Sequence, residues 1–134
     1  MMQKDMALLI VDVQNDFCPG GALSVPSGDR VVAPLNQLAQ TCAVANVPVI
    51  ATRDWHPAGT RHFRDRGGIW PPHCVQESAG AAFHPGLQLP AGTLVVSKGT
   101  DPDADGYSAF EAAAEDGRDL RQLLADLGVH HLLI

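Results

Sequence analysis

The chain has 134 residues, of which 46% are hydrophobic and 18% charged, and its formal net charge at pH 7 is −6. This length suffices for one hydrophobic core, so we expect residues 1–134 to form a single domain. The negative charge and the lack of any lysine or arginine cluster argue against a nucleic acid or an anionic membrane surface as partner.

The chain also lacks the marks of a membrane or secreted protein. Its longest apolar run, at 7–11, is too short to span a bilayer, and Asp12 follows it directly, unlike in a secretory signal. The cysteines Cys18, Cys42 and Cys74 form no CxxC motif and leave one unpaired in any disulfide scheme. These features predict a reducing, cytoplasmic location.

Strand-like and helix-like segments alternate along the chain. The continuous apolar run at 7–11 predicts a buried strand that ends at Asp12. Apolar residues at helical spacing then predict a helix that begins near Val31, with Asp29 as its N-cap and Asn46 close to its end. This order is the beginning of an alternating strand and helix pattern.

Further strands and a second helix follow. Residues 47–52 predict the second strand and residues 93–97 the third. Leucines within 120–127 form a helical stripe with Gly128 at its end, and residues 131–134 begin a fourth strand. The alternation predicts an α/β fold, a parallel sheet with helices on both faces in three Rossmann-like layers.

Reactive side chains follow the first three predicted strands. Asp12 follows the first strand, Asp54 and His56 the second, and Lys98 the third. Because ligands bind at the carboxyl edge of a parallel sheet, we expect these groups to meet in one site. A carboxylate beside an ammonium suits activation of a nucleophile, with the carboxylate as base. In the alternative, Asp12 only caps a strand end and Lys98 is a solvated loop lysine.

The segment 53–75 is a long loop rich in proline, glycine and histidine. Loops of this length and polarity are usually functional. Asp54, His56 and His73 are metal-ligand types, and three protein ligands leave positions open, as in catalytic metal sites. His62 is either a further ligand or a surface hydrogen-bonding residue. Zinc, iron and manganese all suit this set.

Six short motifs together carry a resemblance to a known family. They are Asp12-Val-Gln-Asn-Asp-Phe17, Asp54-Trp-His56-Pro, His62-Phe, Trp70-Pro-Pro-His73-Cys-Val, Lys98-Gly-Thr and Tyr107-Ser-Ala-Phe110. In this order they resemble the nicotinamidase branch of the isochorismatase-like cysteine hydrolases, over nearly the whole chain. The metal histidines distinguish this branch from the isochorismatases proper.

The resemblance implies an amidase that hydrolyses nicotinamide to nicotinate and ammonia through a cysteine thioester. Asp12 would take the thiol proton and Lys98 would stabilise the charged site. In the family, a Gly-x-Ala-x-Asp-x-Cys stretch after the fourth strand carries the nucleophile, and this sequence ends before it, at Ile134. We therefore expect an incomplete domain that lacks the last strands and helices. The isolated chain should be nearly inactive, and its exposed sheet edge makes a homo-oligomer plausible.

The resemblance also implies a divalent metal on Asp54, His56 and His73, in some members with His62, that faces the pyridine nitrogen of the substrate. The ring would lie between the aromatic residues Phe17, Trp70 and Tyr107, although the last two could instead be core packing. Two other functions stay open. One is hydrolysis of another small amide, such as a carbamoyl compound, and the other is metal binding without catalysis.

Overall fold

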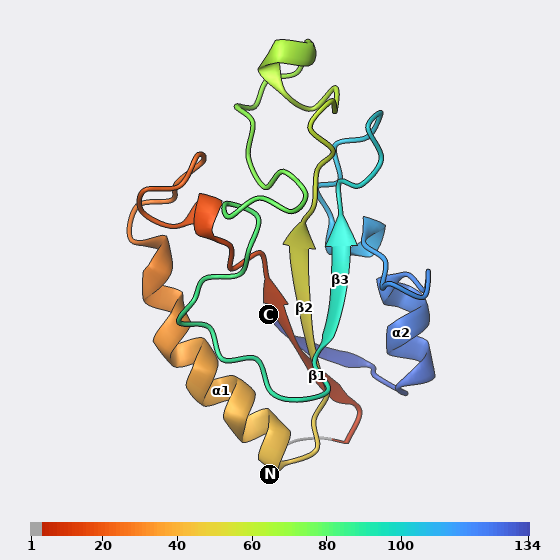
Figure 1. Cartoon of the computed structure of the whole chain (residues 1–134). Helices are drawn as coiled ribbons and strands as arrows, with labels where there is room; N and C mark the ends of the chain where they lie inside the picture. Colours follow the sequence, from red (N-terminus) through yellow and green to blue (C-terminus); the bar gives the residue numbers. More distant parts are fainter. Residues whose placement is uncertain (1–3) are drawn as a thin grey trace.

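The computed structural model describes residues 4–134. At its centre is a parallel four-stranded sheet in the order β3-β2-β1-β4 (Figure 1). The strands are β1 (Met6–Val11), β2 (Val49–Asp54), β3 (Leu94–Lys98) and β4 (His131–Leu133). This arrangement confirms the predicted α/β fold with a parallel sheet.

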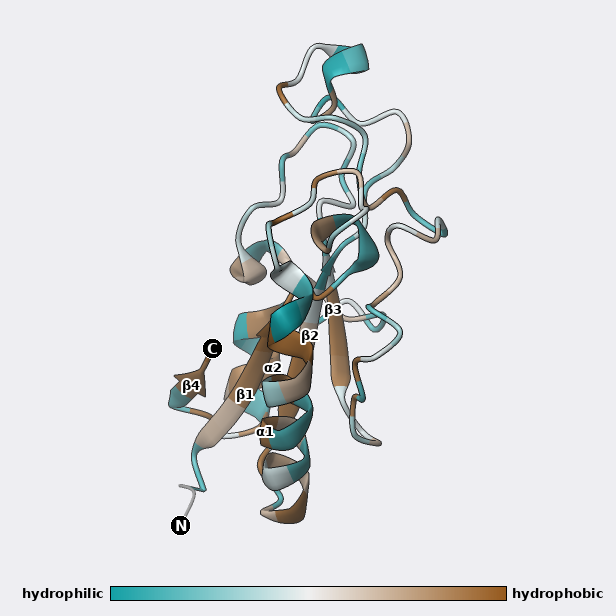
Figure 2. Ribbon diagram, turned by 90° about the vertical axis from the view of Figure 1, so that its left-hand side faces the viewer, coloured by the Kyte–Doolittle hydropathy of each residue, from teal (hydrophilic) through white to brown (hydrophobic). Residues whose placement is uncertain are grey.

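The two helices cover opposite faces of the sheet. They are α1 (Val32–Val44) and α2 (Leu120–Asp126). Successive side chains of β1 point to opposite faces, so Leu8 packs in one core cluster with Cys42 of α1, and Leu9 in the other with Leu123 of α2. Figure 2 shows hydrophobic strands at the centre and more hydrophilic loops beyond their ends. The expected three layers are confirmed.

The start of α1 differs from the prediction. Asp29 is not the N-cap, because a 3-10 turn at Gly28–Val31 runs directly into the helix and Val31 precedes it with helical backbone angles. An N-cap side chain needs an extended backbone, which this junction lacks. Pro34 falls in the first turn, where the missing N–H breaks no helical hydrogen bond.

The end of β2 also lies further along the chain than predicted. The strand covers Val49–Asp54 rather than 47–52, so Asp54 is its last residue. Its pairing with β3 places Asp54 directly opposite Lys98. The sheet register therefore puts these two charged side chains together at the carboxyl edge.

The second helix has the boundaries that its sequence indicates. Asp119 and Gln122 form a capping box at its start, which satisfies two main-chain N–H groups. Gly128 follows its end with φ of +66°, a conformation that glycine adopts without strain. Neither α1 nor α2, nor any other helix within residues 4–134, has the length and apolar character needed to cross a membrane.

Candidate active site

Three charged side chains meet at the carboxyl edge of the sheet. The ammonium of Lys98 lies 2.7 Å from Asp12 Oδ2 and pairs with Asp54 Oδ1 as well. Thr52 donates its hydroxyl hydrogen to Asp12 Oδ1 at 2.6 Å. Asp12 has a left-handed backbone with φ of +52°, which turns the chain sharply at the end of β1. The structure thus brings together the three residues that follow separate strands.

Burial and mutual attraction act against each other in this cluster. Burial opposes the charge on Lys98, which is 4% exposed, but Asp12 and Asp54 outweigh it and raise the pKa of the ammonium. Burial likewise opposes ionisation of Asp54, but the adjacent imidazoles of His56 and His73 and the nearby Lys98 hold the pKa of its carboxyl well below the usual range. Both groups are therefore charged at neutral pH.

Three histidines form a second cluster beside the charged one. Candidate ligand atoms of His56, His62 and His73 all lie within 4.8 Å of one another, and all three residues are buried. Each Nδ1 has a hydrogen-bond acceptor: the main-chain oxygen of Gly99 for His56 at 3.1 Å, that of Pro71 for His73 at 2.7 Å, and Asp105 Oδ1 for His62 at 2.7 Å. When Nδ1–H donates, the Nε2 lone pair is left free, as in metal-binding histidines.

The chemistry of this cluster fits a divalent cation. Within residues 4–134, His56 Nε2 is the one buried side-chain nitrogen or oxygen without a hydrogen-bond partner. It lies 3.5 Å from Asp54 Oδ2, and His73 Nε2 lies 3.6 Å from the same oxygen. Nitrogen lone pairs that face a carboxylate oxygen need a proton or a metal ion between them. Imidazole and carboxylate ligands suit zinc, iron or manganese.

Glycine at position 99 is needed for this arrangement. Gly99 has φ of +66°, and a side chain there would collide with the ring of His56. The main-chain oxygen that orients the His56 ring belongs to the same residue. One glycine therefore provides both the space and the acceptor for a candidate ligand.

The structure adds Gln14, to which the sequence analysis assigned no role. Its buried side-chain amide accepts from Asp54 N at 2.9 Å and donates to Asp54 O and Ala81 O, both at 2.8 Å. The Gln14 amide thus bonds both main-chain groups of Asp54, as a neighbouring strand would, and fixes the end of β2. The residue lies within the first family motif, but a single glutamine after a strand carries no signal that distinguishes this role.

None of the three cysteines is exposed enough to react readily. Cys18, Cys42 and Cys74 are free and buried. Burial raises the pKa of the Cys74 thiol, and the nearby carboxylates of Asp54 and Asp16 raise it further. Asp16 also accepts a hydrogen bond from Cys74 N at 2.7 Å and so anchors the main chain beside His73. These features disfavour Cys74 as a nucleophile.

The two clusters open into one hollow of about 220 Å³. The predicted aromatic residues Phe17, Trp70 and Tyr107 all line it. Trp70 donates its indole N–H to the Tyr107 hydroxyl at 2.9 Å, so two distant loops close one side of the hollow. Tyr107 is 61% exposed and therefore does not belong to the hydrophobic core.

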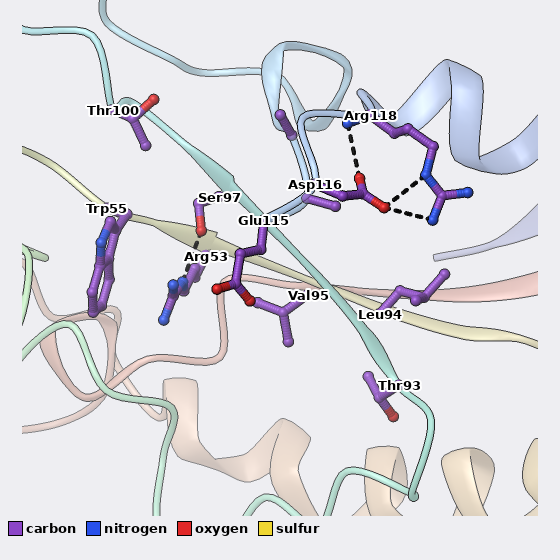
Figure 3. A pocket seen from close by; sticks show the side chains of 12 residues that line it. Arg53, Trp55, Thr93, Leu94, Val95, Ser97, Thr100, Glu115, Asp116 and Arg118 are labelled. Carbon is purple, nitrogen blue, oxygen red and sulfur yellow. Dashed lines mark hydrogen bonds and ion pairs between the residues drawn. The ribbon is translucent and has the colours of Figure 1, made fainter.

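A larger hollow of about 960 Å³ lies along the outer side of β3. Figure 3 shows that three of its charged side chains interact with their neighbours: Arg53 donates to Ser97, and Arg118 pairs with Asp116. Arg53 also lies over the ring of Trp55 at 3.7 Å. The smaller hollow is the better candidate for catalysis, because the charged cluster and the histidines converge there.

Comparison with known proteins identifies the family. A model of the isochorismatase domain matches residues 6–134. The chain belongs to the isochorismatase family. The nicotinamidase of Escherichia coli K12, for example, is 45% identical over 119 residues, which cover 78% of this chain and 56% of that protein. The predicted resemblance to the nicotinamidase branch of this family is confirmed.

Solved structures of the isochorismatase family show the same fold. The pyrazinamidase of Pyrococcus horikoshii, in complex with zinc, is 41% identical with a TM-score of 0.83, and the match covers 96% of this chain and 68% of that one. PnC1 from L. infantum, in complex with nicotinate, is 36% identical with a TM-score of 0.79 and respective coverages of 96% and 65%. The chain spans 56 to 67% of the first curated relatives that it matches.

Proposed function

We propose that this chain carries the base, the lysine and the metal site of a nicotinamidase-type amidohydrolase. The observation that carries the proposal is the convergence of the Asp12–Lys98–Asp54 cluster with His62 and His73, and with His56 buried behind them, on one hollow bordered by Trp70 and Tyr107. Relatives named nicotinamidase, and a relative solved with nicotinate, support this substrate class.

In this proposal Asp54, His56, His62 and His73 hold a divalent cation. Zinc is supported by the related pyrazinamidase solved with that metal, while iron and manganese suit the same ligands. When bound, the ion supplies an electrophilic position that can orient the pyridine nitrogen of the substrate. The aromatic side chains of Phe17, Trp70 and Tyr107 would then contact the ring.

The proposed reaction uses the two partners of the Asp12–Lys98 ion pair in different ways. Asp12 accepts the proton of the cysteine thiol that the family resemblance implies, which is none of the three cysteines present here. The thiolate forms a bond to the carboxamide carbon, and the carbon–nitrogen bond breaks as the amide nitrogen takes the proton from Asp12 and leaves as ammonia. Lys98 stabilises the changing negative charge. Water then cleaves the thioester, which releases nicotinate and restores the thiol.

The proposal is tested by ammonia release from nicotinamide, using a full-length protein that contains these 134 residues. We expect turnover in that protein and a loss of about 10⁴-fold or more in Asp12→Ala, because such residues act as a unit. Asp116→Ala, an exposed residue on the other hollow, is the matched control and should retain activity. Absence of ammonia from nicotinamide in the full-length protein would contradict the proposal.

A second candidate function is metal binding without turnover. The histidine cluster favours it, because all four candidate ligands lie within the described residues whereas the nucleophile does not. The 134-residue chain would then retain stoichiometric zinc, iron or manganese and release no ammonia. Loss of the metal in both His56→Ala and His73→Ala would support the site. A cytoplasmic location and self-association stay predictions.

A further inference from the structure

The loop after β3 supplies a carboxylate to the histidine cluster. Asp105 Oδ1 lies 2.7 Å from Nδ1 of His62, although the two residues are 43 positions apart in the sequence. The His62 side chain is 4% exposed, whereas that of Asp105 is 57% exposed. An exposed acidic residue thus reaches the buried ring from outside.

This contact sets His62 apart from the other two histidines. His56 and His73 donate to main-chain oxygens, whereas His62 donates to a charged carboxylate. A carboxylate partner fixes the tautomer of an imidazole and raises its basicity more than a neutral oxygen does. The His62 Nε2 is therefore left free to bind a metal, and its ring stacks on that of His56 with 4.6 Å between the ring centroids.

The loop that carries Asp105 is itself attached to the histidine segment. Pro102 O accepts from Arg61 N at 2.9 Å and from the Thr60 hydroxyl at 3.2 Å. In Figure 1 this loop lies beside the long loop that follows β2. These two contacts hold the loop that carries Asp105 beside the segment that carries His62.

We propose that Asp105 is a positioning residue that holds His62 as a metal ligand. The inference rests on the proposed metal site. Metal would bind directly to the ring of His62, while Asp105, which lines the edge of the same hollow, accepts the Nδ1 hydrogen and acts through that ring. His62 would then be a full ligand rather than a surface hydrogen-bonding residue.

The test is the affinity of the 134-residue chain for Co²⁺, measured by competition with a chelator, together with the visible absorption of the bound ion. We expect Asp105→Asn to weaken binding by about 10-fold to 100-fold, the usual effect of losing such a partner. Asp103→Asn is the matched control: it removes the same charge from the same loop, but Asp103 pairs with the exposed Arg61. That variant should bind within about twofold of wild type.

A double-mutant cycle separates a role through His62 from a general effect of charge. In a His62→Ala background, Asp105→Asn should cause no further loss of Co²⁺ affinity, because the ring on which it acts is gone. A further tenfold loss in that background would overturn the proposal. The proposal would also be overturned if Asp105→Asn and Asp103→Asn had the same Co²⁺ affinity and the same absorption spectrum.

The outcomes also distinguish this inference from the proposed function. If wild type binds Co²⁺ and Asp105→Asn binds equally well, only the role of Asp105 fails. If wild type binds no Co²⁺, the metal site fails, and the role of Asp105 with it. In the presence of a chelator, Asp105→Asn and Asp103→Asn should have the same midpoint of urea unfolding. A loss of Co²⁺ affinity in Asp105→Asn then reports on the site rather than on the fold.

Discussion

The charged cluster and the histidine cluster adjoin each other but are built differently. Asp12, Asp54 and Lys98 sit at the ends of strands, where the sheet register sets their positions. His62 and His73 sit on the long loop, where hydrogen bonds to other loops orient their rings. The first cluster is rigid because of the sheet, and the second depends on contacts between loops.

The clusters also differ in how their charges are satisfied. Lys98 lies between two carboxylates, so the charged cluster is largely complete by itself. The buried His56 Nε2 has no hydrogen-bond partner among residues 4–134, so the histidine cluster has a free position for a proton or a metal ion. We therefore expect the charged cluster to stabilise the fold without a ligand and the histidine cluster to stabilise it further when an ion binds.

The largest effect on stability should come from Lys98→Ala. The substitution leaves two carboxylates close together and partly buried without their cation, which should cost about 3–5 kcal/mol of unfolding free energy. Urea unfolding in the presence of a chelator measures this loss. Arg61→Ala, which breaks an exposed ion pair, should cost less than about 1 kcal/mol. Equal losses in the two variants would show that the charged cluster does not stabilise the fold.

Metal should stabilise the chain through the histidine cluster. Zinc at about 100 times its dissociation constant should add about 2.7 kcal/mol to the unfolding free energy, and a chelator should remove that gain. The gain should disappear in His56→Ala and persist in His130→Ala, which changes an exposed histidine. Stabilisation by zinc that survives in His56→Ala would place the metal elsewhere.

A smaller loss of stability is expected from Gln14→Ala, because Gln14 supports Asp54, the residue that the two clusters share. The substitution leaves both main-chain groups of Asp54 without their buried partner and should cost about 1–3 kcal/mol. It should also weaken zinc binding, because Asp54 contacts His56 and His73. Calorimetric titration with zinc, compared between Gln14→Ala and the exposed Gln88→Ala, measures this second effect. Unchanged zinc affinity would show that Asp54 needs no such support.

The smallest effect is expected when the folded chain is treated with a thiol reagent. Burial raises the pKa of Cys18, Cys42 and Cys74 alike, so iodoacetamide at neutral pH should modify none of them while the chain is folded. Mass spectrometry should find three modified cysteines after unfolding in urea. Rapid modification of Cys74 in the folded chain would reopen its candidacy as a nucleophile.

The strand-borne part of the site could be predicted from sequence more fully than the loop-borne part. Asp12 and Lys98 follow apolar runs whose ends meet at one edge in any parallel sheet. The position of His62 depends on a carboxylate 43 residues away, and Asp101, Asp103 and Asp105 look equivalent in sequence. Local spacing carries no information on such contacts.

The same distinction accounts for the error at α1. Apolar spacing identified the helix, because the face that packs on the sheet repeats with the helical period. The choice of Asp29 as N-cap failed because the preceding turn already has helical geometry, which residue type alone does not indicate. Sequence patterns therefore located the elements better than their junctions.

At Asp12 the preference of the backbone and that of the side chain oppose each other. Glycine adopts φ of +52° more readily than any residue with a side chain, so the backbone conformation alone would favour glycine at this position. Glycine there would also remove the carboxylate that pairs with Lys98. Breaking the ion pair of a buried ammonium costs about 3–5 kcal/mol, whereas a left-handed backbone costs about 1–2 kcal/mol. A laboratory evolution experiment that rewards only heat resistance should therefore retain the aspartate, even though catalysis is not selected.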